Sequence, residues 1–115
     1  VEPNKTATMK DFDKIIWRNA LTFVDFFAVW CGTCRAMTPV IDRFQKQMNG
    51  RADVYRMDIE DPDLLEIVRR YNIVSVPTLM FFRRGEVLWR ESGRVDYEHL
   101  VNVLNELEKH EHVLL

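Results

Sequence analysis

The sequence is poor in cysteine, glycine and proline, and it lacks both long hydrophobic runs and an excess of charge of one sign. Two cysteines are too few for a framework of structural disulfides. No apolar stretch approaches the roughly 20 residues that a transmembrane helix needs, so we expect no membrane span. A net charge of −2, with basic and acidic residues interspersed, argues against nucleic acid or an acidic lipid surface as a partner.

The remaining composition is that of an ordinary folded protein. Its 115 residues are 47% hydrophobic and 30% charged, which is enough for one hydrophobic core. We therefore expect a single, monomeric domain over residues 1–115, loosely ordered at 1–8 and 110–115. The chain begins with Val1 rather than methionine. This leaves open a cytoplasmic protein, or a periplasmic or other extracytoplasmic one from which a signal segment was removed.

Hydrophobic periodicity predicts an α/β protein. Strands are expected at 22–29 and 52–58, as a hairpin at 78–82 and 86–91, and as a short edge strand near 5–8. Helices are expected at 10–19, at 35–48, from Asp61-Pro62 to Tyr71, and after Asp96. The order of these elements indicates a central mixed sheet with helices on both faces.

The two cysteines stand three positions apart, in Trp30-Cys31-Gly32-Thr33-Cys34, between the first long strand and the helix that follows it. A helix N-terminus favours an anion such as a thiolate, so Cys31 is the candidate nucleophile. Cys34 lies one turn into the helix, where we expect it to be more buried, and is the candidate resolving thiol. The alternative is a pair of inert core thiols, which this position at a strand-to-helix junction disfavours.

We expect neither a metal nor an organic cofactor. A zinc site needs about four ligands, and the three histidines, His99, His110 and His112, lie in or beyond the last helix without metal-ligand spacing. Arg35 rather than histidine follows Cys34, which excludes the motif for covalent haem attachment.

Asp25 lies in the middle of the most apolar strand. A buried carboxylate is costly unless it has a partner or a proton. The functional interpretation is a proton acceptor beneath the cysteine pair that activates Cys34. The alternatives are a solvated strand end or an ion pair with Arg56.

Three further residues, two prolines and a tryptophan, are candidates for a structural or a functional role. Pro77 stands at the entry of the hairpin; a cis bond is one interpretation, but spacing alone favours an ordinary trans proline. Trp30 is either a core residue or a contact surface for partner proteins. Pro39 lies inside the expected second helix, which it should bend.

Several motifs, in order and at matching spacing, resemble the thioredoxin family. The segment from Val24 to Arg35, followed by Pro39, closely resembles the family's active-site segment. The similarity extends to the family's cis-proline loop, hairpin and late glycine at Val76-Pro77-Thr78, Phe81-Phe82, Gly85 and Gly93. The resemblance covers residues 12–107. It implies a thioredoxin fold and a thiol–disulfide oxidoreductase that reduces protein disulfides.

The resemblance also implies a role for each matching residue. Cys31 is then the attacking thiol, Cys34 the resolving thiol, Asp25 the buried acid and Pro77 a cis-proline. The residues expected to contact substrate are Trp30, Gly32, Thr33, Val76, Pro77 and Gly93. The implied partners are disulfide-containing proteins, with an external reductase or a small thiol to return the pair to the dithiol.

The sequence departs from the family pattern at three places. Thr33 replaces the usual proline between the cysteines, Phe27 replaces a common tryptophan, and residues 58–71 hold an acidic, somewhat longer helix. These departures bear on redox potential and partner choice. Two other functions are weighed beside it: an extracytoplasmic disulfide oxidase or isomerase, and a non-catalytic binding module that uses Trp30 and Val76-Pro77, which the intact cysteine pair and Asp25 disfavour.

Overall fold

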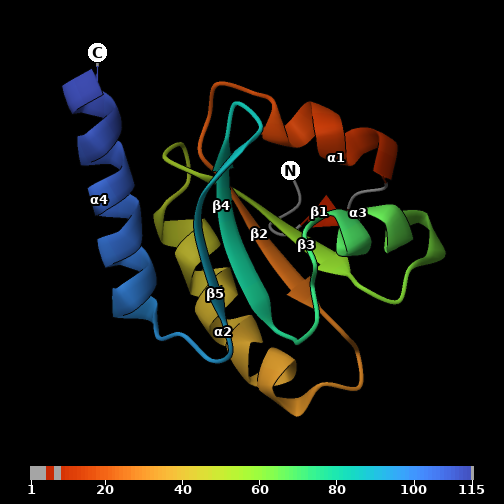
Figure 1. Cartoon of the computed structure of the whole chain (residues 1–115). Helices are drawn as coiled ribbons and strands as arrows, with labels where there is room; N and C mark the ends of the chain where they lie inside the picture. The colour runs from red at the N-terminus through yellow and green to blue at the C-terminus, as the bar shows by residue number, and fades with distance from the viewer. Residues whose placement is uncertain (1–4, 7–8, 115) are drawn as a thin grey trace.

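The computed structural model describes the backbone of residues 5–6 and 9–114 and the side chains of residues 11–110. Its centre is a mixed sheet of five strands in the order β1-β3-β2-β4-β5 (Figure 1). The strands are β1 (Lys5–Thr6), β2 (Thr22–Phe27), β3 (Asp53–Asp58), β4 (Thr78–Arg83) and β5 (Glu86–Ser92). Strands β1, β3 and β2 are parallel, whereas β4 is antiparallel to both β2 and β5.

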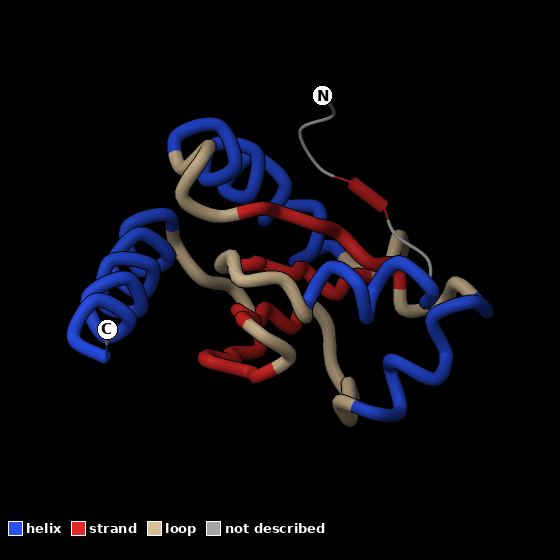
Figure 2. Tube along the Cα trace, turned by 90° about the horizontal axis from the view of Figure 1, so that it is seen from above, coloured by secondary structure: helices blue, strands red, loops and turns tan. Residues whose placement is uncertain are grey.

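Helices cover both faces of this sheet, as the sequence predicts (Figure 2). They are α1 (Met9–Ile16), α2 (Gly32–Gln47), α3 (Leu65–Arg70) and α4 (Tyr97–Leu114), with a short 3₁₀ helix η1 (Pro62–Leu64) before α3. On β2, Val24 and Phe26 face α1 and α3, while Phe23 faces α2 and α4. Because both faces of β2 are covered, its sequence is almost continuously apolar.

Several element boundaries differ from the expectation: α1 ends at Ile16 rather than near residue 19, β2 ends at Phe27 rather than at residue 29, and α2 begins at Gly32 rather than at residue 35. The helix expected from Asp61-Pro62 to Tyr71 is not one regular helix but a 3₁₀ turn followed by a six-residue α3. Asp61 accepts a hydrogen bond from the Asp63 N–H, and the Leu64 N–H bonds to the Asp61 carbonyl, which closes a three-residue turn. The helical segment expected here is thus confirmed from its cap at Asp61 to Arg70, but its first turn is 3₁₀ rather than α.

The two chain ends also bear on the expected boundaries. Helix α4 runs to Leu114, so the backbone of 110–114 is helical, where a loose end was expected. No glycine or proline interrupts residues 97–114, so nothing local ends the helix earlier. At the other end, the expected edge strand is present as β1, while residues 1–4, 7–8 and 115 lie outside the described residues.

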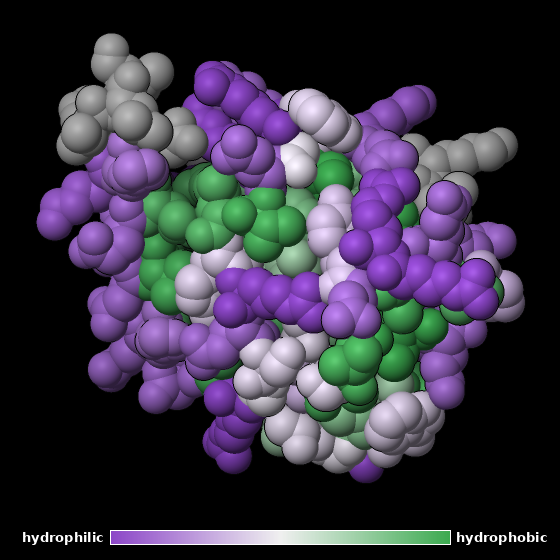
Figure 3. Space-filling model, viewed as in Figure 1, coloured by the Kyte–Doolittle hydropathy of each residue, from purple (hydrophilic) through white to green (hydrophobic). Residues whose placement is uncertain are grey.

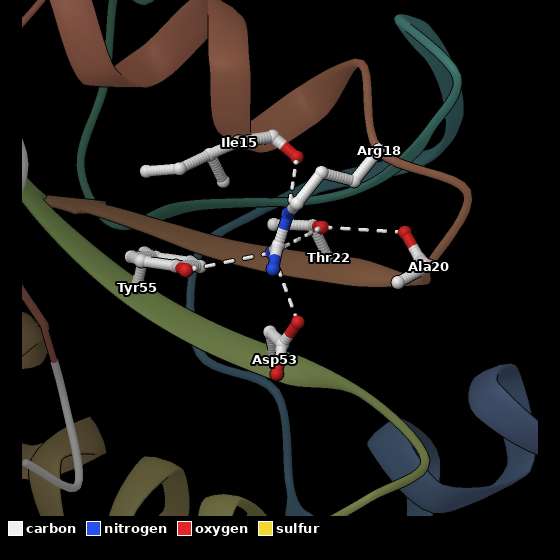
Figure 4. A network of polar contacts seen from close by, with 6 residues as sticks. All are labelled: Ile15, Arg18, Ala20, Thr22, Asp53 and Tyr55. Carbon is white, nitrogen blue, oxygen red and sulfur yellow. Dashed lines mark hydrogen bonds and ion pairs between the residues drawn. The ribbon is translucent and has the colours of Figure 1, made fainter. Parts of the chain in front are cut away.

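A polar network joins the start of β2 to β3 and to the end of α1, at the end of β2 that lies away from the cysteines (Figure 4). The Arg18 guanidinium pairs with Asp53 at 2.9 Å and donates to the Ile15 carbonyl at 3.1 Å. The buried Thr22 hydroxyl donates to the Ala20 carbonyl at 3.3 Å. These contacts join the α1–β2 connection to β2 and β3 at the start of β2. Cys31 lies beyond the other end of this strand.

Candidate active site

The site begins where β2 ends and α2 starts. Cys31 is the N-cap of α2, with extended backbone angles (φ −83°, ψ 112°). Its Sγ accepts a hydrogen bond from the Cys34 N–H at 3.1 Å, one of the unpaired donors of the first helical turn. Cys31 and Cys34 form a disulfide, with their Cα atoms 5.2 Å apart. The sulfur of Cys31 is therefore held where the helix stabilises negative charge.

The two cysteines differ in exposure in the order that the sequence predicts. Cys31 is 6% exposed and Cys34 is 1% exposed. Both pack with Ala28, and the half-buried Phe27 and Ile59 lie against the three of them. A partner sulfur therefore has better access to Cys31 than to Cys34.

A second segment reaches the disulfide from the start of β4. The Val76–Pro77 peptide bond is cis, as the family resemblance predicts and as spacing alone did not. The Val76 carbonyl oxygen lies 3.7 Å from the Cys31 Sγ. Gly93, at φ +93°, donates its N–H to the Pro77 carbonyl at 2.8 Å. The structure thus brings together Cys31, Val76, Pro77 and Gly93, which are far apart in the sequence.

Asp25 is fully buried and lies opposite Arg56 in the pairing of β2 with β3. Its Oδ2 accepts from Arg56 Nε at 3.2 Å, while its buried Oδ1 has no hydrogen-bond partner among the described residues. Burial raises the pKa of Asp25 to about 6, although the Arg56 cation lowers it in part. The ion pair with Arg56 is therefore present and the solvated strand end is wrong, while the role of Asp25 as a proton acceptor stays a prediction.

The departure at Phe27 has a structural partner. The Arg56 guanidinium lies over the Phe27 ring, 4.2 Å from its centroid, a cation–π geometry. Phe27 also packs against the cysteine cluster. Sequence reasoning found Arg56 but missed this contact, because nothing in the spacing shows which ring lies under the guanidinium.

The surface around the disulfide is apolar and exposed. Val29 is 64% exposed, Trp30 62% and Val74 82%. Figure 3 shows apolar residues gathered where β2 ends and β4 begins. The Trp30 Nε1–H donates to a Glu60 carboxylate oxygen at 3.0 Å, so Trp30 is a surface residue rather than a core one. Gly32 and Thr33, close to it in the sequence, are exposed as well. The sequence did not predict Val74 as part of this surface, because no motif includes it.

Two features of the described residues concern metal binding and membrane insertion. Within the described side chains, no three His, Cys, Asp or Glu residues are grouped so as to hold a metal ion. Among the described helices, none is both long enough and apolar enough to span a bilayer.

Comparison with known proteins gives a consistent result. The sequence matches the thioredoxin family over residues 3–106. It is 32% identical over 99 residues to a thioredoxin of Staphylococcus epidermidis, covering 86% of this chain and 92% of that protein. It is 34% identical over 86 residues to thioredoxin-1 of Saccharomyces cerevisiae, covering 75% and 81%.

Solved structures show the same fold. Chloroplastic thioredoxin z superimposes with a TM-score of 0.83 at 21% identity, over 95% of this chain and 97% of the other. The thioredoxin of Trypanosoma brucei brucei gives a TM-score of 0.82 at 22% identity, over 92% and 91%.

Proposed function

Because this chain belongs to the thioredoxin family and is a thiol–disulfide oxidoreductase of the protein-disulfide reductase type, we propose that Cys31 attacks the substrate and Cys34 resolves the intermediate. The observation that carries this assignment is the position of the Cys31 sulfur. It caps helix α2, accepts the Cys34 N–H and is the more exposed of the two.

The reaction starts from the dithiol. The Cys31 thiolate attacks one sulfur of a substrate disulfide, forms a new S–S bond to it and expels the other substrate sulfur as a thiolate. The Cys34 thiolate then attacks Cys31 Sγ, forms the Cys31–Cys34 disulfide and releases the second substrate thiolate. The substrate gains two electrons and, after protonation, two protons, while the protein is oxidised to the disulfide.

Asp25 is the proposed acceptor of the Cys34 proton in the second step. Its pKa of about 6 lies close to neutral pH, where a base is both available and strong enough. Its buried Oδ1, which has no protein partner among the described residues, is free to take part in such a transfer, directly or through a water molecule.

The substrate segment is proposed to bind in an extended form beside Val76. The Val76 carbonyl lies next to the Cys31 sulfur, and a backbone group at that place can pair with an added strand. The exposed Trp30, with Gly32, Thr33 and Gly93 around the disulfide, completes the contact surface. The partners are then polypeptides whose disulfide lies in a segment that can be extended.

We propose further that the protein acts as a monomer and that an external reductase or a small thiol regenerates its dithiol. The reduction potential of the Cys31–Cys34 pair decides between the two compartments left open. A strongly reducing value fits the cytoplasm, and a more oxidising value fits an extracytoplasmic setting.

Reduction of insulin by the protein with dithiothreitol as electron donor tests this function. We expect turbidity as the freed chains precipitate, and an inactive Cys31→Ser variant. Cys34→Ser should instead accumulate a mixed disulfide with a substrate protein, because the second attack has lost its nucleophile. Adducts on Cys31→Ser but not on Cys34→Ser would reverse the two roles, and a parent protein without any activity would refute the function.

A further inference from the structure

The loop between α3 and β4, residues 71–77, is held at one end by Arg90 of β5 and at the other by Gly93, the residue that follows β5. At its start, the Arg90 guanidinium donates to the carbonyl oxygens of Tyr71 and Asn72, the latter at 2.9 Å. At its end, the Gly93 N–H donates to the Pro77 carbonyl. Strand β5 and the residue after it thus fix the ends of the loop that carries Val76 to the disulfide.

A pair of hydroxyl groups adds a third attachment. Thr78 is fully buried, and its Oγ1 lies 2.7 Å from the Ser75 carbonyl oxygen and 2.8 Å from the Ser92 Oγ. A carbonyl can only accept, and a threonine hydroxyl has a single proton. Thr78 must therefore donate to Ser75, and Ser92 must donate to Thr78. The result is a directed chain of hydrogen bonds from β5 through β4 into the loop.

The hydroxyl chain and the Gly93 N–H together fix the residues on either side of Val76. Ser75 is held through its carbonyl by Thr78, and Pro77 is held through its carbonyl by Gly93. Val76, between them, has its carbonyl oxygen 3.7 Å from Cys31 Sγ. In contrast, Val74 earlier in the loop is 82% exposed. The position of the Val76 backbone relative to the attacking sulfur therefore depends on these attachments.

We propose that Thr78 and Ser92 are positioning residues for the reduction of protein disulfides, which hold the Val76 backbone where the substrate segment pairs beside Cys31. The proposal rests on the function proposed above. Neither hydroxyl has to touch the substrate, since Thr78 is buried and acts through Ser75. A small disulfide without a peptide backbone should gain nothing from this arrangement.

The test compares two substrates in the full-length protein, insulin and the uncharged bis(2-hydroxyethyl) disulfide. Thr78→Val keeps the side-chain shape but removes the hydroxyl. We expect the KM for insulin to rise about threefold to tenfold, the effect of losing one or two hydrogen bonds. The kcat for insulin and the rate on the small disulfide should stay within about twofold of the parent, well below that effect.

Three variants control this result. Thr78→Ser retains the hydroxyl and should behave like the parent. Ser92→Ala removes only the first donor, at an exposed position, and should raise the same KM by a smaller factor; it carries the test if Thr78→Val does not fold. Thr22→Val removes another fully buried threonine hydroxyl, at the far end of β2 (Figure 4), and should leave the KM unchanged.

An unchanged KM in both Thr78→Val and Ser92→Ala would overturn the proposal. So would an equal loss of rate on both substrates, or an equal rise of KM in Thr22→Val. In each case a parent protein that reduces insulin would leave the proposed function intact, whereas an inactive parent would refute that function itself.

Discussion

At the scale of single residues, the site depends on a carboxyl group under opposing influences. Burial of Asp25 favours its neutral form, and the adjacent Arg56 favours its charged form; burial is the stronger, so the pKa is raised to about 6. The Arg56 guanidinium also lies over the Phe27 ring. A group with a pKa close to neutral pH can both take up and release a proton during turnover.

Replacing Arg56 by methionine should raise the pKa of Asp25 still further. The substitution removes both effects that lower this pKa, the charge of Arg56 and its hydrogen bond, and leaves the burial in place, so we expect the pKa to rise by about 1 or more. Carboxyl-carbon NMR of the oxidised protein across a pH series measures it. Arg56→Lys keeps a positive charge and should stay closer to the parent; a pKa in Arg56→Met at or below the parent value would contradict the assignment.

At the scale of secondary-structure elements, the first turn of α2 and the turn of the β4–β5 hairpin are the places where single residues set the local backbone. Helix α2 supplies the cap for the Cys31 sulfur, and Thr33 stands in its first turn. The hairpin turns through Arg84 (φ 50°) and Gly85 (φ 79°), the two left-handed residues of a type I′ turn.

Thr33→Pro should make the protein a stronger reductant. Proline has no N–H, so it removes one of the N–H groups of the first helical turn, whose positive end favours the Cys31 thiolate and hence the dithiol. For this two-electron couple, a loss of ~1.4 kcal/mol lowers the potential by about 30 mV. Equilibration with glutathione measures the change. Thr33→Ala retains the N–H and should stay near the parent; a potential that rises in Thr33→Pro would show that the donor does not set it.

Gly85→Ala should destabilise the protein more than Gly50→Ala. Both glycines have positive φ, which costs an alanine about 1–2 kcal/mol. A Cβ at Gly85 would also lie only 2.6–2.8 Å from ring atoms of Trp17, whereas a Cβ at Gly50 would meet nothing within 4 Å. Urea denaturation of the two oxidised variants measures the difference, and equal losses would mean that the Trp17 ring moves aside without cost.

At the scale of the whole molecule, the buried Asp25 makes stability depend on pH. The ordinary pKa of an aspartate is 3.8, and in the folded protein the pKa of Asp25 is about 6. Between these two pH values the folded protein binds more protons at Asp25 than the unfolded chain does. The free energy of unfolding therefore falls as pH rises through this window and stays lower above it. The protein is thus less stable at neutral pH than it would be with a neutral group in place of the buried Asp25.

Asp25→Asn should then be more stable than the parent at pH 8, by at most about 3 kcal/mol. The gain is reduced by the free energy that Arg56 loses when its ion-pair partner is removed. The difference in stability should shrink toward pH 4, where Asp25 in the folded parent is protonated and therefore as neutral as the asparagine. Denaturation of both oxidised proteins at the two pH values measures it. The same variant should reduce insulin more slowly, by up to about 100-fold; a variant less stable than the parent at pH 8 would contradict the argument.

The sequence by itself determined the parts of this protein that depend on neighbours along the chain. The apolar run of β2, the spacing of Cys31 and Cys34 and the turn at Gly85 each act locally, through burial on two faces, helix capping and positive φ. These patterns predicted the mixed sheet with helices on both faces and the more exposed, helix-capping position of Cys31.

Only the tertiary structure decided the contacts between distant segments. The pairing of Arg56 with both Asp25 and Phe27 requires β3 to lie beside β2, and the chain Ser92–Thr78–Ser75 requires β5 to lie beside β4. The exposure of Val74 depends on how the 71–77 loop is held. Such contacts follow from strand order and from side-chain geometry across the sheet, which no periodicity within one segment encodes.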